Sequence, residues 1–215
     1  MIFVLGIFGV FLFYTIFFTE DPYEKFLLIM PVFLLSIYTG TRINVGGYDY
    51  HVYKYFYELP YFQNPYGYEY FFILLRDFSK FLGLNYNFFL LFLSFIFNFI
   101  IYKLFISYSR YPTLSFLIYL STFYYWHNFT IIRNFIAIII FWISLKYIFE
   151  KKLFTYILLV TLACFFHKTA IILYPFYFLL NYRFTKKSLS FLFILSLIIN
   201  PLSFIISITL SILSE

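Results

Sequence analysis

Long apolar stretches recur along the whole chain and leave few folds open to it. Residues 2–18, 87–105 and 131–149 carry almost no charged side chains. Each run is close to the roughly 17–25 residues that a helix needs to cross the hydrocarbon of a bilayer. Strands of a membrane β-barrel would interrupt such runs with polar residues at alternate positions. We therefore predict an all-α, polytopic transmembrane helical bundle.

The composition agrees with this class and excludes several functions. The chain is 64% hydrophobic and 11% charged, whereas a soluble domain is about half apolar and a quarter charged. The net charge of +6 favours contact with anionic lipid over nucleic acid. Cys164 is the single cysteine, so no internal disulfide forms. The three histidines are scattered without metal-ligand spacing, and no nucleotide-binding glycine loop occurs. We expect no metal and no cofactor.

Eight membrane spans are predicted within a single membrane domain, residues 1–215. The first lacks a basic leader and a cleavage site, which indicates a retained helix. Apolar residues recur at helical spacing from Tyr70 to Leu84, with Arg76, Asp77 and Lys80 on the other side, which is typical of an amphipathic helix in the interface. The predicted spans are 2–18, 25–39, 87–105, 113–125, 131–149, 153–166, 169–181 and 188–210.

Between the second and third spans lies the most polar part of the chain, a predicted outer loop at 40–84. Its first part, Gly40 to Tyr70, mixes charged residues with many tyrosines. Paired glycines and two prolines bend this part, so we expect a shaped loop rather than another span.

Basic residues at the span ends predict the orientation, because Lys and Arg collect on the cytoplasmic side. Eight spans divide the fifteen Lys and Arg residues into nine in four short turns and six spread over longer polar sequence. The nine are predicted to be cytoplasmic, with both termini outside. All three histidines and most acidic residues then lie on the outer face.

Two arginines at span ends on that face are candidate anion ligands. Arg133 stands near the start of an otherwise apolar helix, and Arg42 follows the second span. An arginine at membrane depth usually faces a cavity or a partner, and its guanidinium binds phosphate oxygens through two parallel hydrogen bonds. The alternative is that each reaches the interface by snorkelling.

Three further residues are candidates for proton transfer or sugar binding. Asp49, after paired glycines, is a candidate base, or forms an ion pair with Arg42 or Lys54 that shapes the loop. His167 is a candidate base or a donor to a pyrophosphate, or an ordinary interfacial histidine. Glu69 binds a sugar, or is a favourable charge at a helix N-terminus. The nearby tyrosines can stack on sugars, although an interfacial belt explains them as well.

Four short segments occur in a fixed order between residues 37 and 175. Together they resemble the EpsG family of polysaccharide-biosynthesis membrane proteins, which are Wzy-like polymerases. Asn134 stands where the family usually has Gln. The segments are Arg42 with Gly46-Gly47-Tyr48-Asp49-Tyr50 and Tyr53; Tyr66-Gly67-Tyr68-Glu69-Tyr70; Ile132-Arg133-Asn134 with Ala137; and Phe166-His167-Lys168-Thr169-Ala170.

This resemblance implies an inverting glycosyl transfer at the outer face of the bacterial cytoplasmic membrane. Undecaprenyl-pyrophosphate-linked oligosaccharides would be the substrates, joined into exopolysaccharide, capsule or O-antigen. Asp49, His167 and Arg133 would be catalytic, and Arg42, Glu69 and Tyr53 would bind substrate. Membrane lipids, a flippase and a chain-length regulator are the implied partners. A polysaccharide ligase and a flippase or transporter remain the alternatives. Members of this family are usually longer, so we expect a short or truncated member.

Overall fold

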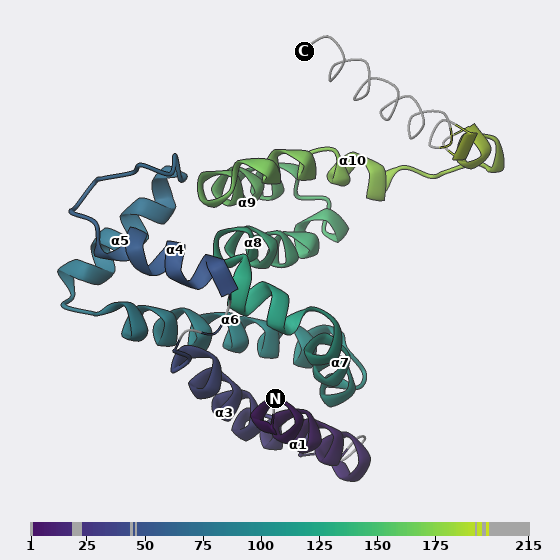
Figure 1. Cartoon of the computed structure of the whole chain (residues 1–215). Helices are drawn as coiled ribbons and strands as arrows, with labels where there is room; N and C mark the ends of the chain where they lie inside the picture. Colours follow the sequence, from purple (N-terminus) through teal and green to yellow (C-terminus); the bar gives the residue numbers. More distant parts are fainter. Residues whose placement is uncertain are drawn as a thin grey trace. The chain divides into compact units, whose positions relative to one another are not determined.

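The computed structural model describes residues 2–18, 23–43, 45, 47–191, 193–194 and 197. All regular structure in these residues is helical (Figure 1), which confirms the all-α prediction for the described part. The chain forms two compact units, residues 1–177 and 178–215. Gly46, the turn at 19–22 and most of the predicted span 188–210 lie outside the described residues.

Two described helices, α6 (Tyr86–Tyr108) and α8 (Ile132–Phe149), are long and apolar enough to cross a membrane. Two further apolar helices are shorter, namely α9 (Leu153–Phe166) and the part of α1 (Ile2–Phe18) from Gly6 onward. These helices have the length and composition of membrane spans, and the count of eight spans stays a prediction.

The N-terminal part packs against α6. The predicted second span is formed by α2 (Glu24–Leu27) and α3 (Ile29–Gly40). Gly40 faces α6 so closely that a side chain there would meet the backbone of Leu91. The Ser94 hydroxyl on α6 donates to the carbonyl of Ser36 at 2.7 Å. These contacts place the end of α3 against the middle of the longest helix.

The fourth predicted span, 113–125, is longer than expected and irregular. It begins as α7 (Pro112–Tyr119) and continues as two π-helical turns, η1 (Leu120–Tyr124) and η2 (Trp126–Thr130). The segment is also more polar inside than the apolar sequence suggests. Asn98 Nδ2 of α6 lies 3.0 Å from both Ser36 Oγ and Tyr124 Oη.

After η2, helices α8 and α9 lie side by side (Figure 1) and make the most extensive helix pair of the unit. The predicted span 169–181 is not one helix. It divides into a 3₁₀ helix, η3 (Lys168–Leu173), and the short α10 (Phe176–Asn181). The break falls at Pro175, because a proline ring clashes with the preceding turn of a helix.

The expectation that residues 40–70 form an irregular loop is wrong for α4 (Gly47–Glu58). Tyr50, Tyr53, Phe56 and Tyr57 occupy one face of this helix and are all buried. Their spacing is that of an amphipathic helix, and Gly47 is its first residue.

The helix predicted from Tyr70 to Leu84 exists as α5 (Tyr70–Phe81), but its polar side is not directed to water. Arg76 is 0% exposed and pairs with Asp77 at 2.6 Å. Its guanidinium also donates to the carbonyls of Phe56 (3.1 Å) and Gln63 (2.9 Å). The polar side of α5 therefore holds the end of α4, at Phe56, and the segment that follows it, at Gln63.

Candidate functional site

A polar cavity of about 230 Å³ lies where α4, α8 and the junction of α9 with η3 meet. Four of the six predicted site residues line it, although they come from distant parts of the sequence. The lining residues are Asp49, Val52, Tyr53, Tyr68, Ile131, Arg133, Asn134 and His167.

Arg133 is held on two sides. Its Nη1 donates to Glu69 Oε2 at 2.5 Å, and its Cζ lies 3.9 Å from the centroid of the Tyr68 ring. Its Nε has no hydrogen-bond partner. A guanidinium fixed by a carboxylate and an aromatic face, with one buried donor unpaired, is suited to pair with an anion that reaches it.

Glu69 stands immediately before α5 and bridges three segments. Besides Arg133, its carboxylate accepts a hydrogen bond from the backbone N–H of Lys168 at 3.0 Å. Its Oε1 also lies 3.4 Å from His167 Nδ1. Burial raises the pKa of Glu69, but the Lys168 hydrogen bond and the Arg133 charge outweigh it, so the net shift is downward. Glu69 is therefore ionised at neutral pH.

His167 follows α9 in extended backbone and presents its ring to the cavity. Burial lowers its pKa, and the Arg133 charge adds to this effect against the opposing influence of Glu69. The imidazole is therefore neutral at pH 7 and can accept a proton. Burial likewise raises the pKa of Tyr68 to about 12, so its phenol stays protonated.

Asp49 is the free carboxylate of the cavity. It lies in the first turn of α4, and no ion pair of Asp49 with Arg42 or Lys54 occurs in the part of the chain that the structure describes. A carboxylate beside a neutral histidine and an arginine can take a proton from a hydroxyl.

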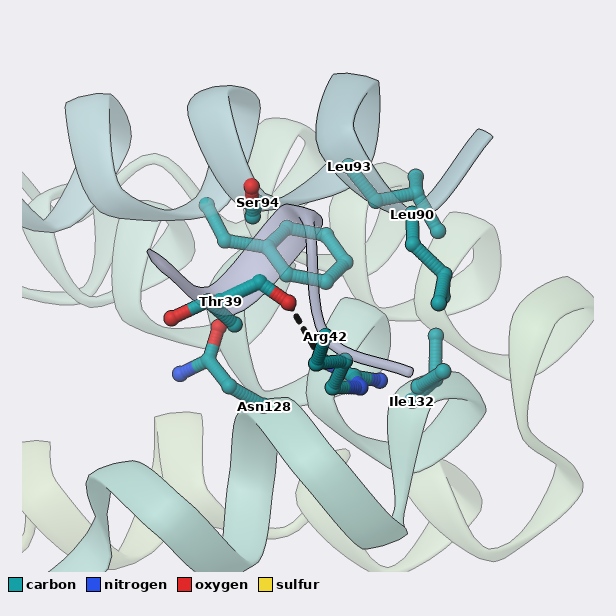
Figure 2. A pocket seen from close by; sticks show the side chains of 8 residues that line it. Thr39, Arg42, Leu90, Leu93, Ser94, Asn128 and Ile132 are labelled. Atoms are coloured by element: carbon teal, nitrogen blue, oxygen red, sulfur yellow. Dashed lines mark hydrogen bonds between the residues drawn. The ribbon is translucent and has the colours of Figure 1, made fainter. Parts of the chain in front are cut away.

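Arg42 lies in a different, much smaller cavity (Figure 2). Its side chain is enclosed, with the residue 7% exposed. Nη1 donates to the Thr39 carbonyl at 3.3 Å, and Cζ lies 4.6 Å from the Phe129 ring centroid. Nε and Nη2 have no hydrogen-bond partner. The two arginines thus do not line one cavity, although Ile132, between Ile131 and Arg133, lines the cavity of Arg42.

Sequence reasoning missed Tyr68 and Asn134 as lining residues. Both stand beside predicted residues, Tyr68 before Glu69 and Asn134 after Arg133. Tyr68 was hidden by the abundance of aromatic residues, which makes any single tyrosine a weak signal. The available signal was the place of Tyr68 between Gly67 and the charged Glu69.

The helices and the cavity define a membrane protein with a polar, arginine-containing site at the end of an apolar helix. The family comparison makes the class specific, because the model of the EpsG family matches residues 25–215. The chain belongs to the EpsG family and to the membrane proteins of exopolysaccharide biosynthesis. No curated protein and no solved structure matches the chain.

Proposed function

We propose that this protein joins lipid-linked oligosaccharide repeat units into a polysaccharide, with undecaprenyl pyrophosphate as the carrier. The reaction would take place at the outer face of the cytoplasmic membrane. One observation carries the proposal: Asp49, Tyr53, Arg133 and His167 line one cavity of about 230 Å³. A base, a sugar-stacking ring and an anion ligand are the groups that such a transfer requires.

Arg133 is the proposed ligand of the leaving pyrophosphate. Its Nε is buried without a hydrogen-bond partner, so a phosphate oxygen that reaches it would complete its pairing while Nη1 stays on Glu69. Charge that develops on the leaving group is stabilised by a donor already held in place, which is usually the largest contribution to catalysis. Glu69, whose oxygens are engaged by protein donors, would orient Arg133 rather than hold a sugar.

Asp49 is the proposed base. A hydroxyl of the acceptor unit attacks the anomeric carbon of the donor and forms the new C–O bond. The C–O bond to the pyrophosphate breaks, its electron pair leaves with the lipid pyrophosphate, and the hydroxyl proton passes to Asp49. His167 is the second candidate for this proton, since it is neutral. The rings of Tyr53 and Tyr68 would stack on the sugars.

Arg42 is proposed to act on the same substrate through its charge. Its cavity adjoins the first turn of α8, which also carries Arg133. Arg42 has no carboxylate partner among the described residues. In a region of low dielectric, such a buried cation favours an anion nearby. The predicted direct contact with phosphate would require the side chain to leave the cavity shown in Figure 2.

One observation favours a second candidate, transport of the lipid-linked unit across the bilayer. Transporters place polar residues and interrupted helices near the middle of the membrane. The π-helical turns η1 and η2, together with the buried Asn98 and Ser36, give the described helices both features. Loss of a transporter removes glycan units from the surface, whereas loss of a polymerase leaves single units there.

The test is complementation of a deletion strain, with the length of the surface glycan as the readout. Asp49→Asn and Arg133→Gln should each leave single repeat units on the surface, at normal protein level in the membrane. Glu58→Gln is the matched control, because Glu58 is an exposed carboxylate at the other end of α4. Wild-type chain lengths in either site variant would contradict the proposal, and absence of any surface unit would favour transport.

A further inference from the structure

An apolar groove of about 370 Å³ lies between the C-terminal ends of α6 and α8, apart from the polar cavity. One charged side chain, that of Lys146, lies among its lining residues. Both helices are long and apolar enough to cross a membrane, and in helices that do so this groove would face the bilayer. The lining residues are Leu104, Phe105, Tyr108, Trp142, Leu145, Lys146 and Phe149.

At the end of this groove, positively charged side chains outnumber negatively charged ones. The Lys146 side chain is 52% exposed, and its Nζ lies 3.5 Å from Glu150 Oε1. The other oxygen of Glu150 is closer to Lys152, at 2.8 Å. One carboxylate is therefore shared by two lysines, and Lys151 follows Glu150 directly. An anionic group would complete the pairing of Lys146.

The carrier lipid of the proposed reaction does not fit this position. Its pyrophosphate would lie at Arg133, near the start of α8, whereas Lys146 is thirteen residues further along that helix. At 1.5 Å per residue this separation is about 20 Å. A lipid whose head reaches Lys146 has its head at the opposite side of the bilayer and is a component of that leaflet.

We propose that the groove binds one acyl chain of an anionic glycerophospholipid whose phosphate pairs with Lys146. The acyl chain would pack against Phe105 and Trp142 in place of the more loosely packed chains of the surrounding bilayer. Lys146 would favour a lipid with a negatively charged head group. Near an anionic membrane surface one basic residue contributes enough to favour an anionic over a zwitterionic lipid by about fivefold.

The experiment uses Trp142 as the reporter. The chain has two tryptophans, and Trp126 is 61% exposed, so Trp126→Phe leaves Trp142 as the single tryptophan. The full-length protein is reconstituted with phosphatidylglycerol or phosphatidylcholine carrying brominated chains, which quench tryptophan fluorescence on contact. We expect Trp142 to be quenched at about fivefold lower mole fraction of the anionic lipid.

Three variants separate this site from general membrane charge. Lys146→Gln should remove the preference, and Glu150→Gln should increase it, because the competing carboxylate is gone. Lys103→Gln removes an equal charge from α6 beside the groove and should leave the preference intact. Equal quenching of Trp142 by the two lipids would overturn the proposal. An unchanged preference in Lys146→Gln would overturn the assignment of the lysine.

Discussion

The Glu69 bridge gives the sharpest prediction, because one carboxylate holds both Arg133 and the backbone at Lys168. The perturbation is Glu69→Gln, which keeps the size of the side chain and removes its charge. The amide oxygen can still accept a hydrogen bond from the Lys168 N–H, whereas the amide NH₂ then replaces the oxygen that accepts from Arg133, so the 2.5 Å ion pair is lost. The variant therefore tests the charge and not the packing.

Burial of the pair sets the size of the effect. Breaking a fully buried ion pair costs about 3–5 kcal/mol, and an exposed pair contributes about 0.2–1 kcal/mol. The side chains of Arg133 and Glu69 are 20% and 11% exposed, so the loss lies between these limits. We expect about 2 kcal/mol, which is about a 30-fold lower rate if the loss falls on the transition state.

The assay is the initial rate of polymer formation by purified protein with lipid-linked repeat units, measured across pH. A second readout is the pH at which the rate falls on the acidic side of the pH–rate profile, its acid limb. Glu69 raises the pKa of His167 against the effect of burial, so Glu69→Gln lowers that pKa further. If neutral His167 is required, the acid limb moves to lower pH, and it disappears in His167→Asn.

The matched control is Glu150→Gln, which removes a carboxylate from an ion pair at the far end of α8. It should leave the rate and the pH profile unchanged. A wild-type rate and an unmoved acid limb in Glu69→Gln would refute the reasoning that Glu69 positions Arg133 and sets the charge of His167.

Three further predictions concern stability in detergent, measured by thermal melting. Arg76→Lys should lower the free energy of unfolding by about 2–4 kcal/mol, because a lysine cannot reach several carbonyls and Asp77 together. Gly40→Ala should cost about 1–3 kcal/mol, since the added methyl group collides with the α6 backbone. Stability should fall below pH 6.5, because the folded pKa of His167 lies below its ordinary 6.5, and again below pH 4.5 through Glu69. In both groups the folded state binds fewer protons than the unfolded chain at these pH values.

The two substitutions have matched control variants, and the pH prediction has an outcome that would contradict it. Gly9→Ala in α1 adds the same methyl group where it meets no neighbour, and should be neutral or stabilising through helix propensity. Lys80→Arg, on the same helix as Arg76, should be tolerated because one carbonyl contact, to Leu59, is at stake. A melting temperature independent of pH between 7 and 5 would contradict the assignment of His167.

The lengths of the apolar runs predicted the positions of most of the described helices. They did not predict α4, which lies inside the polar segment 40–84. Helix α9 begins and ends where the sequence predicts, at Leu153 and Phe166, because charged turns limit it on both sides. Helix α4 was missed because tyrosines also stand on its exposed side, at Tyr48 and Tyr55. Residue type alone therefore did not separate the buried face at Tyr50, Tyr53 and Tyr57 from the exposed one. Whether such a segment forms a helix depends on burial of one aromatic face against the rest of the fold.

The site was less predictable than the helices. The sequence identified Arg133, His167 and Asp49 from residue type and position, and these line one cavity. It also grouped Arg42 with Arg133 because both stand at span ends on one predicted face. The Arg42 side chain packs against neighbours such as Phe129 instead of lining that cavity. No local sequence pattern specifies such neighbours.

The Glu69 bridge also has a consequence for how the protein is made. The residues it joins, Glu69 and Lys168, are 99 positions apart, and a ribosome adds about 5–20 residues per second. The carboxylate is therefore inserted about 5–20 s before its last partner leaves the ribosome. Arg133 follows Glu69 by 64 positions, so both are present without Lys168 only over the last 35 of those 99 residues, which takes about 2–7 s. Assembly of the site is therefore one of the later events of membrane insertion.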